Sequence, residues 1–125
     1  VSDVNGGFYN KKGLDIKELF DYVRENNSLK GYPNAEQVTN EELLALKCDI
    51  LIPAALGGVF DRKTAEKAQT KIVIEAANNP TTVAGDQVFN DRGIPVIPDA
   101  FCNAGGVIVS YFEWIQNLQQ YKWSL

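Results

Sequence analysis

The chain has 125 residues, of which 45% are hydrophobic and 22% are charged, and its formal net charge is −4 at pH 7. This composition is typical of one globular domain rather than of a disordered or fibrous protein. Acidic and basic residues are interspersed, so neither nucleic acid nor a membrane surface is an expected partner. Apolar runs of about five residues are also too short to cross a bilayer.

The cysteines and the chain ends give further expectations. Cys48 and Cys102 are the only cysteines, they form no Cys-x-x-Cys pair, and the chain has no histidine. Reduced thiols in a cytoplasmic protein are therefore the simplest interpretation, and no metal site is expected. Val1 is preceded by neither a methionine nor a signal peptide, and Leu125 follows a predicted helix without a stop signal. We expect a part of a longer polypeptide.

Capping patterns predict two helices in the first half of the chain. Asp15 begins an amphipathic helix over residues 15–26, and the glutamate three residues later fits a capping box. Thr39 and Glu42 repeat this pattern before a short leucine-rich helix. The turn-rich stretch between the two helices is interpreted as a surface loop.

Three short apolar runs predict the strands of one sheet. They are Ile50 to Ile52, Ile72 to Ile74 and Val96 to Ile97, with helices predicted between them over residues 61–69 and 82–90. Strands that alternate with helices favour a parallel sheet with right-handed crossovers and helices on both faces. The expected fold class is therefore α/β, a doubly wound parallel sheet. In such sheets ligands bind beyond the carboxyl ends of the strands, which brings Ala54, Asn78 and Asn103 to one edge.

The most informative stretch is residues 103–114, N-A-G-G-V-I-V-S-Y-F-E-W, at the start of a helix predicted over residues 103–121. Helical spacing places Asn103, Val107, Ser110 and Trp114 on one stripe. The two glycines before Val107 allow close approach to a helix N-terminus, where an anion is favoured. The alternative is an ordinary buried helix that Asn103 caps and whose aromatic residues pack into a core.

This stretch resembles the signature of glutamate dehydrogenases, within the wider family of glutamate, leucine, phenylalanine and valine dehydrogenases. Residues 75–82, E-A-A-N-N-P-T-T, are similar to the family string Glu-Gly-Ala-Asn-Gly-Pro-Thr and depart from it at Ala76 and Asn79. Residues 53–55 resemble a Pro-Ala-Ala element. The resemblance implies that residues 1–125 form the downstream part of an NAD(P)-binding domain. This would be a truncated Rossmann-like fold without its first strand, and no Gly-x-Gly-x-x-Gly loop occurs in the chain.

The resemblance also implies roles for individual residues. Asn78 would contact the nicotinamide ribose and Asn103 the nicotinamide amide, while small side chains at Ala54 and Ala55 would let the cofactor lie against the backbone. Val107 would pack near the substrate, and the Ser110 hydroxyl would bind the side-chain carboxylate of glutamate. An acid at the position of Asp3 accepts hydrogen bonds from the adenosine ribose, which favours NAD while leaving NADP possible. On residues alone, this aspartate before Asn-Gly is typical of a turn, and only its position in the expected fold favours the ribose contact as much.

The implied reaction is the oxidative deamination of L-glutamate to 2-oxoglutarate and ammonia with NAD(P). The family's catalytic Lys and Asp lie in another domain and no matching motif occurs here, so no catalytic residue is assigned and the chain alone is expected to be inactive. The resemblance implies a homo-oligomer. The alternative is a non-catalytic α/β ligand-binding or regulatory module.

Overall fold

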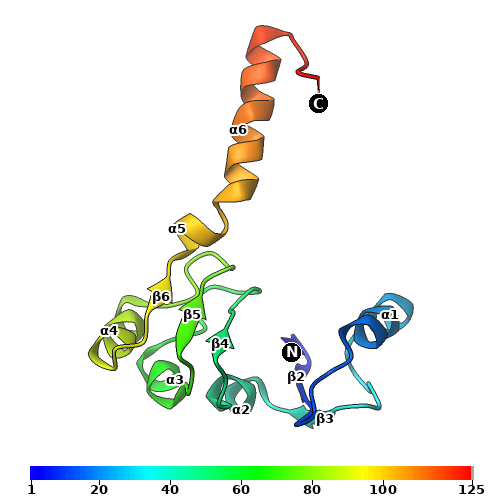
Figure 1. The fold of residues 1–125 in the computed structure, drawn as a ribbon, viewed down its shortest axis with the longest axis vertical. Coiled ribbons are helices and arrows are strands. Elements are labelled where there is room, and N and C mark those ends of the chain that lie inside the picture. The colour runs from blue at the N-terminus through cyan, green and yellow to red at the C-terminus, as the bar shows by residue number, and fades with distance from the viewer. Residues whose placement is uncertain (125) are drawn as a thin grey trace.

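The computed structural model describes residues 1–124. Leu125, at which we expected the chain to end without a stop signal, lies outside the described residues. The chain is an α/β protein with two three-stranded sheets, one antiparallel and one parallel. Figure 1 shows the two sheets side by side, with the last helix projecting away from both. The α/β class is as predicted, whereas the antiparallel sheet was not expected.

The antiparallel sheet is formed by the N-terminal part of the chain. Its strands β1 (Ser2–Asp3), β2 (Gly6–Tyr9) and β3 (Glu36–Val38) are neighbours in chain order. Helix α1 (Ile16–Asn26) is capped by Asp15, whose carboxylate accepts the Glu18 N–H at 3.0 Å. The reciprocal bond of a capping box is not formed because the Glu18 carboxylate accepts from Asn34 instead. A small core joins the helix to the sheet and consists of Phe8, Leu19, Leu29 and Tyr32.

The parallel sheet confirms the three predicted strands. Strands β4 (Ile50–Leu51), β5 (Ile72–Ile74) and β6 (Val96–Ile97) pair in the order β4-β5-β6. The register aligns Leu51 with Val73 and Ile74 with Ile97. The carboxyl ends of all three strands therefore meet at one edge, as the sequence predicted.

Each helix that precedes or connects these strands begins after a residue whose side chain caps it. Helix α2 (Asn40–Ala45) has the complete Thr39–Glu42 capping box. Helix α3 (Arg62–Lys67) begins after Asp61, which accepts from the Thr64 N–H at 2.8 Å. Helix α4 (Val83–Asp91) begins after Thr82, which accepts from the N–H of Gly85 at 3.2 Å. Side-chain oxygens at these positions satisfy donors that the first helical turn leaves unpaired.

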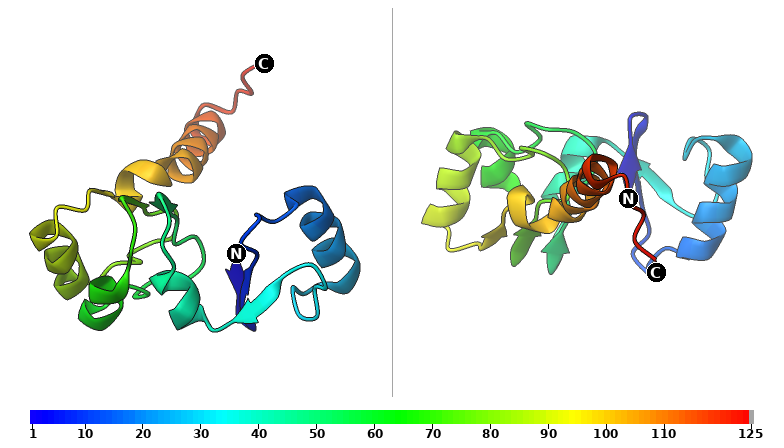
Figure 2. Two further views of the ribbon diagram at one scale, coloured as in Figure 1. Left: turned by 60° about the horizontal axis from the view of Figure 1, so that its bottom comes forward. Right: turned by 90° about the horizontal axis from the view of Figure 1, so that it is seen from above.

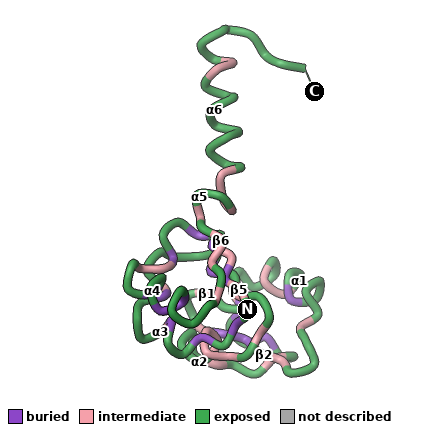
Figure 3. Tube along the Cα trace, turned by 60° about the vertical axis from the view of Figure 1, so that its left-hand side comes forward, coloured by how far each residue is buried: buried purple, intermediate pink, exposed green. Residues whose placement is uncertain are grey.

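The core of the parallel sheet lies on the face covered by α3 and α4. Val73 in β5 is fully buried, and the rings of Phe60 and Phe89 meet edge to face at 5.3 Å. On the other face, Ile50 and Ile52 are each 55% exposed. Figure 3 shows buried residues concentrated in the body of the molecule. Within residues 1–124 the sheet is thus covered well on one face only, and the double covering that we predicted is not observed.

The C-terminal helix differs from the prediction at both of its ends. Helix α5 (Asp99–Cys102) ends at Asn103, and α6 (Ala104–Gln119) starts after that residue, so the helix predicted over residues 103–121 is shorter and begins at a break. Asn103 makes no side-chain capping bond, because its amide contacts the loop after β5. Gln120 ends α6 in a left-handed conformation.

Helix α6 has no buried residue in the described chain, so the packing into a core that the buried-helix alternative expects is not observed within residues 1–124. Val107 is 73% exposed and Trp114 is 56% exposed. The left view in Figure 2 shows α6 extending beyond the two sheets. Of the helices within residues 1–124, none is long and apolar enough to span a membrane.

Candidate functional site

The loops that follow the three parallel strands are joined by backbone hydrogen bonds. The N–H groups of Ala76 and Ala77 both donate to the Pro53 carbonyl, at 3.1 and 2.9 Å. The Glu75 N–H donates to the Ile97 carbonyl at 3.0 Å. These bonds continue the parallel ladder past its last strand residues, so the three loops form one edge of the sheet.

Two asparagine side chains meet at this edge. The Asn103 amide donates to the Asn78 side-chain oxygen at 2.6 Å and contacts the Ala76 carbonyl at 3.4 Å. Asn78 is exposed and Asn103 is half-buried. Among residues 1–124, no group pairs with the Asn78 NH₂ or with the Asn103 side-chain oxygen. The pair therefore presents one donor group and one acceptor to a ligand.

Two carboxylates at the same edge accept hydrogen bonds from the backbone of its loops. Glu75, only 7% exposed, accepts the Asp99 N–H at 3.1 Å. The Asp99 carboxylate in turn accepts the Asn79 N–H at 2.7 Å. We did not assign a role to either residue from the sequence. The available signal was their position, since each carboxylate comes immediately after a strand or one residue later.

The loop after β5 shows why this chain tolerates its departure from the family string. Asn79 has a φ of +45°, in the left-handed region where glycine and asparagine are the favoured residues. An asparagine can therefore take the place of the family's glycine there. Gly57 faces the same loop, and a Cβ at Gly57 would lie 3.0 Å from the Asn78 carbonyl. The loop geometry thus depends on a small residue at position 57.

Ala54 and Ala55 lie at the predicted edge but make no side-chain contacts that test their role. Both are exposed, whereas Pro53 before them is buried and its carbonyl anchors the loop after β5. Their small side chains leave the backbone accessible. Their assignment to cofactor binding stays a prediction.

Asp3 lies in the antiparallel sheet, and no described contact joins it to Asn78 or Asn103. Its carboxylate accepts the Asn5 N–H at 2.7 Å and the Leu29 N–H at 3.3 Å. Burial acts to raise the pKa of Asp3, but these hydrogen bonds outweigh it and hold the pKa below its ordinary value. In this structure Asp3 is the last residue of β1, and its carboxylate bonds the backbone of the turn that follows and of Leu29. Its proposed contact with a ribose stays a prediction.

Val107 and Ser110 lie on the exposed helix α6. The Ser110 hydroxyl donates to the Gly106 carbonyl one turn earlier, at 3.0 Å. Open space surrounds both glycines of the first turn, because a Cβ at Gly105 or Gly106 would meet no heavy atom within 4 Å. The predicted close approach to this turn is thus sterically free, and the substrate roles of Val107 and Ser110 stay predictions.

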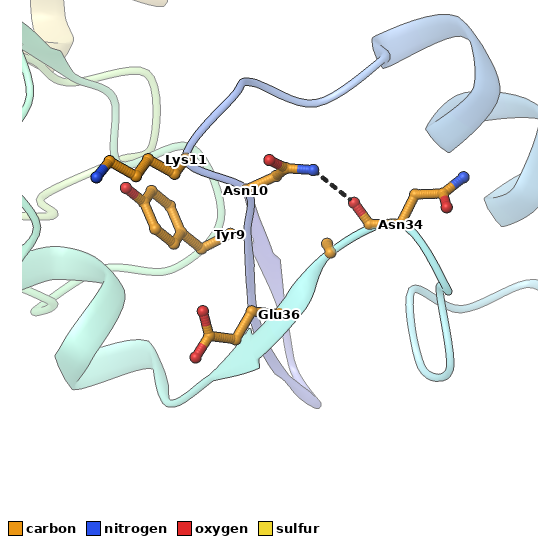
Figure 4. Close-up of a pocket in the computed structure, with 6 residues that line it drawn as sticks. Tyr9, Asn10, Lys11, Asn34 and Glu36 are labelled. Atoms are coloured by element: carbon orange, nitrogen blue, oxygen red, sulfur yellow. Dashed lines mark hydrogen bonds between the residues drawn. The ribbon is translucent and has the colours of Figure 1, made fainter.

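A shallow cleft lies away from this edge, beside the antiparallel sheet. Figure 4 shows a shallow cleft of about 620 Å³ beside the antiparallel sheet. The Asn10 amide there donates to the Asn34 carbonyl at 2.9 Å, so this amide already pairs within the protein. The lining residues are Tyr9, Asn10, Lys11, Asn34, Ala35 and Glu36. The volume of this cleft would suit a ligand. The side chains that point toward one another, Asn78 and Asn103, lie instead at the carboxyl edge of the parallel sheet, which we take as the candidate site.

No metal chemistry is indicated in the described part of the chain. Residues 1–124 contain no cluster of three His, Cys, Asp or Glu side chains that could hold an ion. Cys48 and Cys102 are half-buried free thiols, as the sequence indicated.

The fold is that of an α/β protein, with a pair of polar side chains at the carboxyl ends of its parallel strands. The profile of the Glutamate/Leucine/Phenylalanine/Valine dehydrogenase family matches residues 1–125. The chain belongs to this family, as the sequence motifs indicated.

Several of the relatives found by comparison are glutamate dehydrogenases, and one solved structure that matches, with a TM-score of 0.61 and 31% identity over 87% of this chain and 30% of the other, is an L-tryptophan dehydrogenase from Nostoc punctiforme. The chain is 51% identical over 125 residues to the glutamate dehydrogenase of Thermotoga maritima, covering 100% of this chain and 30% of that protein. Among solved structures, a hetero-hexameric glutamate dehydrogenase from Thermus thermophilus in a Leu-bound form matches with a TM-score of 0.80 and 32% identity, over 95% of this chain and 28% of the other. Plasmodium falciparum glutamate dehydrogenase matches with a TM-score of 0.77 and 30% identity, over 98% and 29%. The chain therefore spans less than a third of these relatives.

Proposed function

We propose that the chain is the downstream part of the NAD(P)-binding domain, of truncated Rossmann type, in a glutamate dehydrogenase. Such an enzyme oxidatively deaminates L-glutamate to 2-oxoglutarate and ammonia. The observation that carries the proposal is the Asn78–Asn103 pair at the carboxyl edge of the parallel sheet. Residues 25 positions apart in the sequence meet there, each with an unused polar group.

The chemistry of this pair fits a nicotinamide nucleotide. Ribose hydroxyls and a carboxamide each offer both donors and acceptors, and the free Asn78 NH₂ and Asn103 oxygen are one of each. Ala54 and Ala55 would leave room for the cofactor along the backbone, and Asp3 would favour NAD over NADP. The cofactor, when bound, supplies the hydride acceptor. The residues of this chain bind and orient it.

Substrate recognition would come from the first turns of α6. The Ser110 hydroxyl is held by a backbone carbonyl, and as an exposed group it can turn toward a ligand oxygen without breaking a buried contact. A hydroxyl suits the side-chain carboxylate of glutamate, because an apolar pocket would leave that charge unpaired. Val107, one turn earlier, would pack against the aliphatic part of the substrate.

The chain by itself should bind cofactor weakly and not turn over glutamate. Its sequence contains no Gly-x-Gly-x-x-Gly phosphate loop, and no lysine–aspartate acid/base pair is assigned in it. We further propose that the complete protein is a cytoplasmic homo-oligomer. The support for assembly is the apolar surface of α6, which the described residues leave exposed.

Titration of the chain with NADH, followed by the cofactor's own fluorescence, tests the proposal. We expect saturable binding that Asn78→Ala and Asn103→Ala each weaken by about fivefold or more, the value of one lost hydrogen bond. Asn90→Ala, on the exposed side of α4, is the matched control and should leave binding unchanged. Absence of saturable binding, or equal losses in all three variants, would refute the assignment of this edge to the cofactor.

A further inference from the structure

Asp99 hydrogen-bonds the backbone next to Asn78 and the backbone of Asn103. Its carboxylate accepts the N–H of Asn79, which forms the peptide bond that follows Asn78. Its backbone carbonyl accepts the N–H of Asn103 at 2.9 Å. One residue at the start of α5 thus holds the backbone on each side of the 2.6 Å contact between the two amides.

The conformation of the loop makes the carboxylate bond important. Asn79 adopts a φ of +45°, in the left-handed region that residues with side chains rarely adopt and that asparagine tolerates better than most. Within residues 1–124, the Asp99 carboxylate is the acceptor for the Asn79 N–H. Without that acceptor, the loop loses a contact that compensates for its left-handed turn. The Asn78 side chain, one residue earlier, is then free to leave Asn103.

Glu75 fixes Asp99 in the same way from the end of β5. Its buried carboxylate accepts the Asp99 N–H, a donor that the first turn of α5 leaves without a helical partner. The two acids therefore connect the loops after β5 and β6 through backbone groups rather than through each other. Such bonds from a charged acceptor are shorter and stronger than neutral ones.

We infer that Asp99 is a positioning residue for the candidate site, which holds Asn78 and Asn103 at hydrogen-bonding distance by bonding the backbone of the loop between them. The expected effect of Asp99 on NADH binding rests on the function proposed above, whereas its effect on the Asn78–Asn103 contact does not. Asp99 need not touch the ligand. Its effect on binding passes through Asn78.

The first experiment examines the ligand-free chain. The Asn103 side-chain NH₂ resonances are recorded by ¹H–¹⁵N NMR in the wild type, Asp99→Ala, Asp99→Asn and the control Asp91→Ala, whose carboxylate only pairs with Gln87 on the surface of α4. In Asp99→Ala we expect the signal to move to the position of a solvent-exposed amide. Asp99→Asn keeps an oxygen acceptor and should restore the wild-type position, as should Asp91→Ala. An unchanged Asn103 signal in Asp99→Ala overturns the inference.

If Asp99→Ala does not fold, Asp99→Ser replaces it. A serine keeps a polar group at the start of α5 but is one atom shorter than aspartate, so it should not reach Asn79 and the same signal change is expected. A wild-type Asn103 signal in Asp99→Ser would contradict the inference as well.

The second experiment measures the dissociation constant for NADH in a double-mutant cycle. Asp99→Ala should weaken binding by up to the loss seen in Asn78→Ala, about fivefold, because its effect passes through the hydrogen bonds of Asn78. In an Asn78→Ala background the same change should add little, because the effect passes through Asn78. Additive losses would show that Asp99 acts on binding independently and would overturn its positioning role. If the wild type binds no NADH, the proposed function fails, while the Asn103 resonance still decides whether Asp99 holds the pair.

Discussion

The substitution Gly85→Ala tests how closely α4 packs against the segment before α3. A Cβ at Gly85 would lie 2.2 Å from the Phe60 carbonyl oxygen, a distance that real contacts do not reach. That oxygen also accepts two hydrogen bonds from Thr82, from its N–H at 2.9 Å and its hydroxyl at 3.1 Å. Relief of the clash therefore has to separate α4 from Phe60, whose ring is fully buried.

The expected loss of stability follows from these contacts. Overpacking costs about 1–3 kcal/mol, and weakening the two bonds from Thr82 costs about 1 kcal/mol each. Replacing glycine by alanine inside a helix returns about 1 kcal/mol. We expect a net destabilisation of about 3 kcal/mol.

Native-state hydrogen exchange at Val73 measures this loss, because its N–H donates to the Pro95 carbonyl at 3.0 Å in the centre of the parallel sheet. The control is Gly106→Ala, where a Cβ meets open space, and exchange at Val73 should then be unchanged. If Gly85→Ala left the Val73 exchange rate at its wild-type value, the reasoning from this contact would be wrong.

Three further predictions concern single interactions. The Arg92 guanidinium donates to carbonyls at the end of α3, including Ala68 at 2.7 Å, so Arg92→Met should lower the unfolding free energy in urea by about 1–2 kcal/mol while Arg62→Met has little effect. Asn79→Val should cost about 1–2 kcal/mol in the same assay because a β-branched residue disfavours a φ of +45°, and Asn79→Gly should cost nothing; equal losses would contradict this explanation. Hydrogen bonds from the Thr64 side chain and backbone lower the pKa of the Asp61 carboxyl, so its stabilisation is present above the unfolded pKa of about 4 and is lost as pH falls through the lower folded value. The melting temperature should therefore fall on acidification below about pH 4, and less steeply in Asp61→Asn; parallel curves would exclude this role.

Local signals predicted the parallel half of the fold. The runs at β4, β5 and β6 are short and largely β-branched. Thr39 caps α2 and Asp61 caps α3, so each of these elements is encoded within a few residues. The edge that brings Asn78 to Asn103 followed from parallel pairing alone. The antiparallel sheet did not follow, because β1 has two residues and pairs through a turn that ends at Gly6, with a φ of +130°.

The remaining differences arise from contacts between distant segments. Asn103 was expected to cap a helix, and its amide bonds Asn78 instead, which no local pattern reveals. The carboxylates of Glu75 and Asp99 accept from backbone N–H groups, which almost every residue type has, so the residue type of the donor does not reveal the partner. The exposure of α6 was likewise not predictable, because an apolar helix reads the same whether or not the described residues cover it.

The position of the two tryptophans determines what intrinsic fluorescence reports in this protein. Trp114 lies on α6 and is 56% exposed. Trp123 follows α6 and is 44% exposed, and its ring lies 5.5 Å from the ring of Phe112 in that helix. Their emission therefore describes the surroundings of the projecting helix, and the melting of the Phe60–Phe89 core would leave it almost unchanged. A partner that covers α6 would shift the emission to shorter wavelength without any change in the body of the protein. In this chain, intrinsic tryptophan fluorescence therefore reports association at α6 rather than unfolding of the core.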